Sequence, residues 1–242
     1  MEKVTLERFI SKYNLGGSAD SVMWTIDNET LTTRVISDDK SVMGVISLSE
    51  FNSLEDEKIA IYDTTQLRAL LKVLDEDVKL SFGKTGNRVT SLKMDDKNTK
   101  VSFMLADEKV IPEVPNLKGL PKFEVEIGID KKFSTTFVKA KSAMGDSAET
   151  FTVTSTGGKK AQIVLGHSSA NSNKVTLEAD APVNVKLEPI SFHASYLSEI
   201  LIANKECEKG TIAVSSNGLA HVTFEHTDNF STDYYLVEVQ KG

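Results

Sequence analysis

Two spacings of apolar residues alternate along the chain and predict most of its secondary structure. In four segments the apolar residues recur every three or four positions, which places them on one face of a helix. Elsewhere they alternate with polar residues or form short runs, as is typical of strands. The predicted helices cover residues 4–14, 64–74, 130–141 and 194–204. The predicted strands cover residues 21–26, 30–37, 41–48, 57–63, 78–83, 88–95, 99–106, 122–129, 149–156, 160–168, 174–180, 184–193, 210–216, 219–226 and 233–239.

Polar residues and glycines mark where several of these elements begin and end. Asp63 precedes the second helix and Gln66 follows three residues later, a spacing typical of a capping box. Asp130 stands in the same place before the third helix, where its carboxylate can accept the unpaired amides of the first turn. Gly16 and Gly17 follow the first helix, as a helix C-terminus favours. The predicted boundaries therefore have local chemical causes.

The same order of elements occurs twice. Residues 1–106 and residues 122–242 each contain two predicted helices among short strands, although the two halves share little sequence identity. The segment 107–121 between them holds three of the five prolines, which interrupt helices and central strands, and it is also rich in apolar residues. We therefore predict two similar α+β domains with antiparallel sheets, joined by an apolar connector over residues 107–121.

The net charge is negative, but basic residues concentrate on the predicted helices. The 242 residues carry a formal charge of −7 at pH 7. Such a chain can still bind nucleic acid through one basic surface, because the local field matters more than the sum. Well-spaced lysines without exposed aromatic neighbours contact phosphates rather than bases, so the predicted ligand is double-stranded DNA. The predicted DNA-binding residues are Lys3, Arg8, Lys12, Arg68, Lys72, Lys131, Lys132, Lys139, Lys141, Lys205 and Lys209.

The first residues and the single cysteine indicate in which cellular compartment the protein is expected. Lysine and glutamate interrupt the first residues before any apolar run forms, so no signal peptide is expected. No run of about 18 apolar residues occurs that could span a membrane. The single cysteine, Cys207, excludes an internal disulfide and fits a reducing compartment. We expect a soluble cytoplasmic protein, in the cytoplasm of the host cell if it is viral.

No combination of residues indicates catalysis. The triplet 83–85, Gly-Lys-Thr, matches the end of a phosphate-binding loop, but Val78 stands where that loop requires glycine, so a hairpin turn is expected instead. The four histidines show no metal-ligand spacing with one another or with Cys207. We therefore predict that the protein is not an enzyme and has no catalytic residues, no metal site and no cofactor.

The order of elements and several strings resemble the DNA sliding clamps, the ring-shaped processivity factors of DNA polymerases. KIAIYDTTQLRALLKVL and the connector LADEKVIPEVPNLKGLPKF are similar to segments of the clamp of large tailed bacteriophages, and DYYLVEV is similar to the terminal strand of the eukaryotic clamp, proliferating cell nuclear antigen. The resemblance covers the whole chain, but its strings are short. It implies a homotrimer that closes head to tail into a ring of six domains around duplex DNA. It also implies a DNA polymerase and an ATP-dependent clamp loader as partners.

The resemblance further implies two sites. Subunits would join by pairing an edge strand of the first domain with one of the second, and short apolar tails of partner proteins would dock under the connector. The implied subunit interface consists of Thr99, Val101, Phe103 and Leu105 in one chain and Lys174, Thr176 and Glu178 in the next. The implied peptide pocket consists of Val42, Val110, Ile111, Pro112, Val114, Tyr235 and Val237.

Two other functions remain open at this point. A monomer of the same fold could bind DNA through its basic face and tether a polymerase without encircling the duplex. A phage structural or carbohydrate-binding β-sandwich protein is a candidate from a different class, and it predicts no duplex binding. That last candidate leaves the basic helices unexplained.

Overall fold

The computed structural model describes residues 1–242 except 118, 158, 167–172, 182–185 and 240–242. The chain forms two units, each assembled from separate segments. The first unit comprises Met1–Ile36, Gly44–Pro115 and Asp228–Thr232, and the second comprises Ser37–Met43, Asn116–Thr227 and Asp233–Gly242. The main change of unit falls inside the predicted connector. The short segments 37–43 and 228–232 each group with the other half of the chain, so neither unit is one continuous stretch of sequence.

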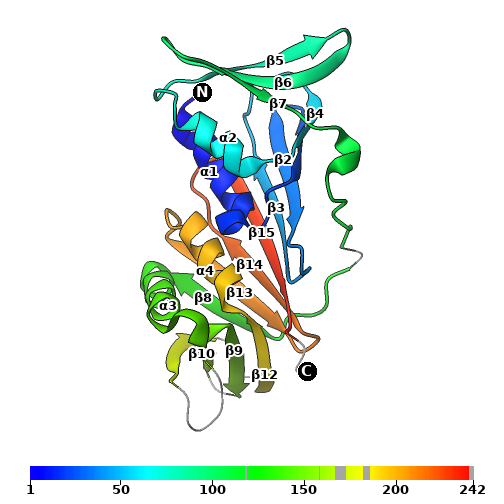
Figure 1. Cartoon of the computed structure of the whole chain (residues 1–242). Helices are drawn as coiled ribbons and strands as arrows, with labels where there is room; N and C mark the ends of the chain where they lie inside the picture. Colours follow the sequence, from blue (N-terminus) through cyan, green and yellow to red (C-terminus); the bar gives the residue numbers. More distant parts are fainter. Residues whose placement is uncertain (118, 158, 167–172, 182–185, 240–242) are drawn as a thin grey trace. The chain divides into compact units, whose positions relative to one another are not determined.

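The first unit contains two helices and two antiparallel sheets (Figure 1). One sheet has the strand order β4-β1-β2-β3 within this unit, and the other has the order β5-β6-β7. The strands β3 and β15 contain residues of both units. The elements are α1 (Lys3–Asn14), β1 (Val22–Asp27), β2 (Thr30–Ile36), β3 (Val42–Leu48), β4 (Glu57–Ile61), α2 (Thr64–Leu71), β5 (Lys79–Thr85), β6 (Arg88–Asp95) and β7 (Lys100–Met104), with 3-10 turns at Leu15–Gly17 and Glu108–Val110.

An aromatic cluster forms the core between α1 and the β1–β2 hairpin. Phe9, Tyr13 and Trp24 are fully buried and meet edge to face, with ring centroids 5.5–6.3 Å apart. This is the geometry that aromatic quadrupoles favour. The Tyr13 hydroxyl lies 3.2 Å from Thr64 Oγ1 at the start of α2, and burial raises the pKa of this tyrosine. The cluster therefore joins both helices to the sheet.

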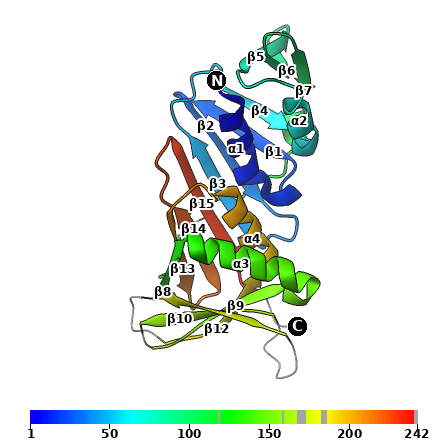
Figure 2. The same cartoon turned by 90° about the vertical axis from the view of Figure 1, so that its left-hand side faces the viewer.

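The second unit likewise contains two helices and two antiparallel sheets. Its sheets have the orders β15-β14-β13-β8 and β11-β10-β9-β12, and α3 packs along α4 (Figure 2). Phe137 of α3 meets Phe151 of β9 edge to face at 5.5 Å, which fixes the helix on the sheet. The elements are β8 (Val125–Asp130), α3 (Lys131–Met144), β9 (Thr150–Thr156), β10 (Lys160–Leu165), β11 (Val175–Asp180), β12 (Lys186–His193), α4 (Ala194–Ala203), β13 (Lys209–Ser215), β14 (Leu219–Phe224) and β15 (Phe230–Val237), with a 3-10 turn at Gly145–Ala148.

The α+β class and the antiparallel pairing predicted from the sequence are confirmed, and the differences concern element ends. The helix α2 ends at Leu71 rather than residue 74, because the amides of Val73 and Leu74 bond to carbonyls only three residues back. The triplet 83–85 is the end of β5, and the two-residue turn follows at Gly86 and Asn87, where Gly86 has φ +61°. Residues 167 and 168, predicted as the end of a strand, lie outside the described residues.

One further property of the helices concerns membranes. Among the helices of the described residues, none is long and apolar enough to cross a membrane.

Candidate nucleic-acid, subunit and peptide-binding surfaces

The helix α3 has one apolar face and one basic face. The Asp130 carboxylate accepts a hydrogen bond of 2.6 Å from the Phe133 amide, so the N-cap predicted from the sequence is present. Phe133 and Phe137 stack at 6.1 Å on the buried face, which leaves Lys132 and Lys139 exposed on the opposite side. These two side chains are therefore available to a ligand in solution.

The two other lysines of α3 have local partners. Lys131 forms an ion pair with Glu208, and both side chains are exposed. Lys141 is half-buried, and its Nζ donates 2.9 Å to the Gly145 carbonyl, which satisfies a backbone group at the end of the helix. A phosphate would therefore have to compete with these contacts, so we expect Lys131 and Lys141 to contribute less than Lys132 and Lys139.

The basic residues of α1 are held within the protein. The Arg8 guanidinium bonds to the Asp228 carboxylate at 2.7 Å and lies 4.6 Å over the Phe230 ring. Lys12 is fully buried, with its Nζ 5.2 Å from the same ring. The structure therefore removes Lys12 from the predicted DNA-binding set. The sequence contains a signal for this correction, because Lys12 follows Phe9 by three positions and so borders the apolar stripe.

Three further predicted DNA-binding residues lie where the first two helices meet. Lys3 Nζ donates 2.6 Å to the Leu74 carbonyl, and Arg68 Nη1 donates 3.0 Å to Asn14 Oδ1. The first bond joins α1 to the turn after α2, the second joins α1 to α2, and each engages the cationic group. Lys72 is exposed. In the first unit, Lys72 is therefore the residue of the predicted set best placed to meet a phosphate.

The helix α4 presents a different surface. Its exposed or half-buried positions include Ser195, Glu199 and Ile202, which carry no positive charge. The predicted residues Lys205 and Lys209 follow the helix and are exposed. This agrees with the sequence, in which the fourth helix departs from the basic pattern of the other three.

The strands predicted to form the subunit interface are edge strands. The strand β7 ends the order β5-β6-β7, and β11 begins the order β11-β10-β9-β12. On β7, Val101 and Phe103 face the core, while Thr99 and Leu105 flank the strand. On β11, Thr176 and Glu178 are exposed, and Lys174 precedes the strand. An edge strand can accept a further strand through its outward backbone groups.

A groove of about 700 Å³ runs between the connector and the β1–β2 hairpin in the first unit. Arg34 Nη2 donates 2.6 Å to the Pro115 carbonyl and so fastens the connector to the sheet. Val110 is not part of the lining and is 53% exposed. The groove is lined by Met23, Thr25, Thr32, Thr33, Arg34 and Lys58 from the strands and by Glu108, Lys109, Ile111, Pro112, Glu113 and Val114 from the connector.

The other predicted pocket residues belong to the second unit. Val42 is buried, and Val237 is 46% exposed. The Val237 amide donates 2.9 Å to the Ser41 carbonyl, which places the end of β15 beside the β2–β3 turn. The Tyr235 ring stacks on His221 at 4.5 Å with an interplanar angle of 2°. The structure therefore places Val237 beside the turn that precedes Val42, and Tyr235 against His221 of β14.

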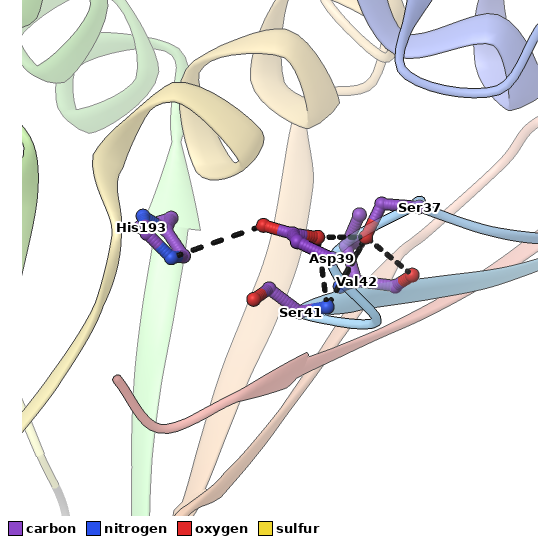
Figure 3. A network of polar contacts seen from close by, with 5 residues as sticks. All are labelled: Ser37, Asp39, Ser41, Val42 and His193. Carbon is purple, nitrogen blue, oxygen red and sulfur yellow. Dashed lines mark hydrogen bonds and ion pairs between the residues drawn. The ribbon is translucent and has the colours of Figure 1, made fainter. Parts of the chain in front are cut away.

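A polar network fixes that turn (Figure 3). The buried Ser37 donates through Oγ to Asp39 at 2.5 Å, and the same Oγ accepts the amides of Ser41 and Val42, each at 3.1 Å. Asp39 also accepts the Ser41 amide at 3.0 Å, and His193 Nε2 at the end of β12 lies 3.9 Å from its other oxygen. Burial alone would raise the pKa of Asp39, but the hydrogen bonds from Ser37 and Ser41 outweigh it and lower the pKa.

Removing the Asp39 carboxylate should destabilise the protein slightly and in a pH-dependent way. A carboxyl whose pKa is lowered in the folded state stabilises that state above its unfolded pKa of about 4, and this contribution disappears as the pH falls through the folded value. At pH 7 the Asp39→Asn variant should lose about 1 kcal/mol, which corresponds to about 2–4 °C in Tm. Thermal unfolding followed by circular dichroism measures the difference in Tm, which should shrink as the pH falls below the unfolded pKa.

The neighbouring acid provides the control. Asp38→Asn changes the same charge on an exposed residue beside the network and should leave Tm unchanged. Equal losses in the two variants at pH 7 would show that the net charge, and not the network at Asp39, determines the effect.

The whole described fold is similar to solved clamps of the proliferating cell nuclear antigen (PCNA) type. PCNA from A. fulgidus, bound to the C-terminal region of FEN-1, matches with a TM-score of 0.78 at 13% identity, covering 100% of this chain and 98% of that one. PCNA from Entamoeba histolytica gives 0.74 at 16% identity, with 99% and 96% covered. PCNA from Thermococcus kodakaraensis gives 0.75 at 17% identity, with 99% and 98% covered. The chain therefore has the fold of the DNA sliding clamps.

Sequence comparisons give no such match. A comparison with models of protein families finds none, and a comparison with curated protein sequences finds none either. At identities of 13–17% the similarity to the solved clamps establishes the fold alone.

Proposed function

We propose that this chain is a DNA sliding clamp, which encircles duplex DNA as a homotrimer and tethers a DNA polymerase for processive synthesis. The observation that carries the proposal is the match of both units, over the full chain, to the clamp fold. The exposed lysines of α3 and the two edge strands add support, because a clamp needs a basic surface for DNA and two edges for closure. A sliding clamp is a scaffold, and we propose no catalytic activity.

The exposed lysines support a weak and non-specific grip on DNA. Lys72, Lys132, Lys139, Lys205 and Lys209 are exposed, and lysine binds phosphate as a point charge without reading the base sequence. Contacts of this kind are equivalent at every position along the duplex, so a ring can move while remaining bound. Enclosure of the DNA then replaces high affinity as the cause of retention.

The edge strands support assembly into a ring. Pairing β7 of one chain with β11 of the next is a heterologous contact, and such contacts produce a closed ring when the rotation between copies allows it. Each chain offers one strand of each kind, so three copies would satisfy all of these edges. The Sulfolobus tokodaii neighbour is a PCNA2–PCNA3 complex, which is an assembly of chains with this fold.

The connector groove and the turn at Val42 support a role in partner binding. The A. fulgidus PCNA structure holds the C-terminal region of FEN-1. In this chain, Ile111, Pro112 and Val114 line the connector groove, and Val237 is half-exposed at the end of β15. We propose that polymerase tails dock on these residues. An ATP-dependent loader is part of the proposal, because the chain has no phosphate-binding motif of its own.

The oligomeric state tests the proposal most directly. Native mass spectrometry and light scattering over a range of protein concentrations should give a species of three times the chain mass of 26.5 kDa. A second arm lets the protein thread onto linear duplex over its free ends. It then compares retention after the ends are blocked by bulky groups with retention on open ends, from which a ring should slide off. If the protein is a monomer at every concentration and is retained equally on both DNA substrates, the ring is overturned and a monomeric tethering factor is favoured. A monomer that binds no DNA would overturn both.

A further inference from the structure

Three side chains with metal-binding atoms meet at the open end of the β13–β14 hairpin. Glu206 and Cys207 follow α4, and His226 follows β14. Their ligand atoms all lie within 4.8 Å of one another, and Cys207 Sγ is 3.3 Å from His226 Nδ1. Cys207 and His226 are half-buried, whereas Glu206 is exposed. A thiol, an imidazole and a carboxylate are thus close together on one edge of the second unit.

The hairpin register explains why residues so far apart in sequence meet here. Gly210 pairs with Phe224 in the antiparallel ladder, and the Glu225 amide donates 3.0 Å to the Lys209 carbonyl just beyond it. The Cys207 amide donates 3.0 Å to the Asn204 carbonyl, which fixes the turn after α4. The sequence predicts no metal site, because the histidines show no metal-ligand spacing with Cys207. A hairpin brings its two ends together whatever the length between them.

We propose that Glu206, Cys207 and His226 bind a divalent transition-metal ion, with Zn²⁺ the expected ion. Zinc takes thiolate, imidazole and carboxylate ligands, whereas Mg²⁺ and Ca²⁺ require oxygen ligands. In a tetrahedral zinc site the sulfur and nitrogen ligand atoms are about 3.6 Å apart, given bonds of about 2.3 and 2.0–2.1 Å. The 3.3 Å between Cys207 Sγ and His226 Nδ1 is close to that separation. Only small side-chain adjustments would bring the exposed Glu206 into the third position.

The ion would complete its shell with water and link two segments. On binding, the Cys207 S–H bond breaks, the sulfur keeps the electron pair and bonds to the metal, and the proton goes to solvent. The bound metal would then connect the turn after α4 to the end of β14. An ion that binds the folded state more tightly than the unfolded chain stabilises the fold. This inference requires no clamp function, and its readouts involve neither DNA nor assembly.

Cobalt titration of the full chain tests the site, since the chain contains a single cysteine. Under reducing conditions with a phosphine reductant, Co²⁺ should produce a thiolate-to-metal charge-transfer band that saturates at one ion per chain. Zn²⁺ should displace the cobalt and raise Tm. The band must disappear in Cys207→Ser, because no other residue can produce it. Absence of the band in the unmodified chain would overturn the proposal.

Matched variants identify the other two ligands. His226→Gln and Glu206→Gln should each weaken cobalt affinity at least about tenfold. Mutating a residue that only hydrogen-bonds to a metal ligand already costs about 10–100-fold in affinity, and removing a ligand itself should cost no less. His221→Gln and Glu208→Gln change the same residue types nearby but outside the cluster, and they should leave the affinity unchanged. Circular dichroism before titration confirms that each variant is folded. His226→Gln could instead give the thiolate band with the same cobalt affinity as the unmodified chain. That result would show that Cys207 binds metal without His226, and it would overturn the proposed site.

Discussion

Replacing Lys100 and Met104 of β7 by glutamate should leave the chain monomeric at concentrations where the unmodified chain is a trimer. Both residues are exposed on this edge strand, and Met104 is 68% accessible. In the proposed ring β7 adds to β11, whose exposed residues include Glu178 and Asp180. Like charges placed opposite each other across strands are destabilising. The variant also loses the burial of Met104, which contributes roughly 1.5–3 kcal/mol when such a side chain leaves water completely.

The opposite edge of the same sheet provides the control for this variant. Lys79→Glu combined with Thr85→Glu makes the same change in charge on β5, where both residues are exposed. Light scattering should find this control as a trimer. Loss of the trimer in both variants would indicate an effect of net charge or of folding. Persistence of the trimer in the β7 variant would show that the subunits join through another surface.

Reversing the charge of Lys132 and Lys139 should weaken duplex binding about fiftyfold at 0.1 M salt. Each phosphate contact to B-DNA contributes a slope of about −0.9 in a plot of log affinity against log salt. The three chains of the proposed ring carry six of these lysines, so the loss of only two contacts, the smallest effect expected, already lowers the magnitude of the slope by about 2. These two lysines are exposed on α3, whereas Lys131 and Lys141 already have partners in the protein. Anisotropy of a labelled duplex, measured at several salt concentrations, gives both the affinity and the slope.

A variant with equal charge change separates the surface from the net charge. Lys93→Glu combined with Lys97→Glu alters exposed residues of β6 and the turn after it, outside every helix. This control should retain the salt slope of the unmodified chain. If both double variants lose the same affinity and the same slope, the basic face of α3 has no special part in DNA binding, and the proposal that its lysines contact phosphates is wrong.

The order of elements was predictable because both spacings of apolar residues are strong in this chain. The stripe of α3 and its Asp130 cap lie within one short segment, so local chemistry determines where that helix begins. The end of α2 was less predictable. Leu74 is buried and continues the apolar spacing, yet the last amides form the tighter bonds of a 3-10 turn. Spacing shows which side chains are buried and does not show which backbone bond each amide makes.

The candidate sites were only partly predictable, because they depend on contacts between distant residues. Lys12 belongs to a basic helix in the sequence, but Phe230 covers it from more than two hundred positions away. His226 reaches Cys207 through a hairpin register that no local motif encodes. The edge positions of β7 and β11 were expected from the resemblance to clamps, and the strand orders place both at edges. Their pairing between chains stays a prediction.

The exchange of short segments between the two units has a consequence for any attempt to divide the chain. A fragment that ends at Pro115 would lack Asp228 and Phe230, which contact Arg8 of α1 within the first unit. The remaining fragment would lack residues 37–43, whose turn carries the Asp39 network beside His193. Each half alone would therefore lose contacts within its own unit, despite the repeated order of elements. We therefore expect that co-expression of both fragments, and neither fragment by itself, restores the native protein.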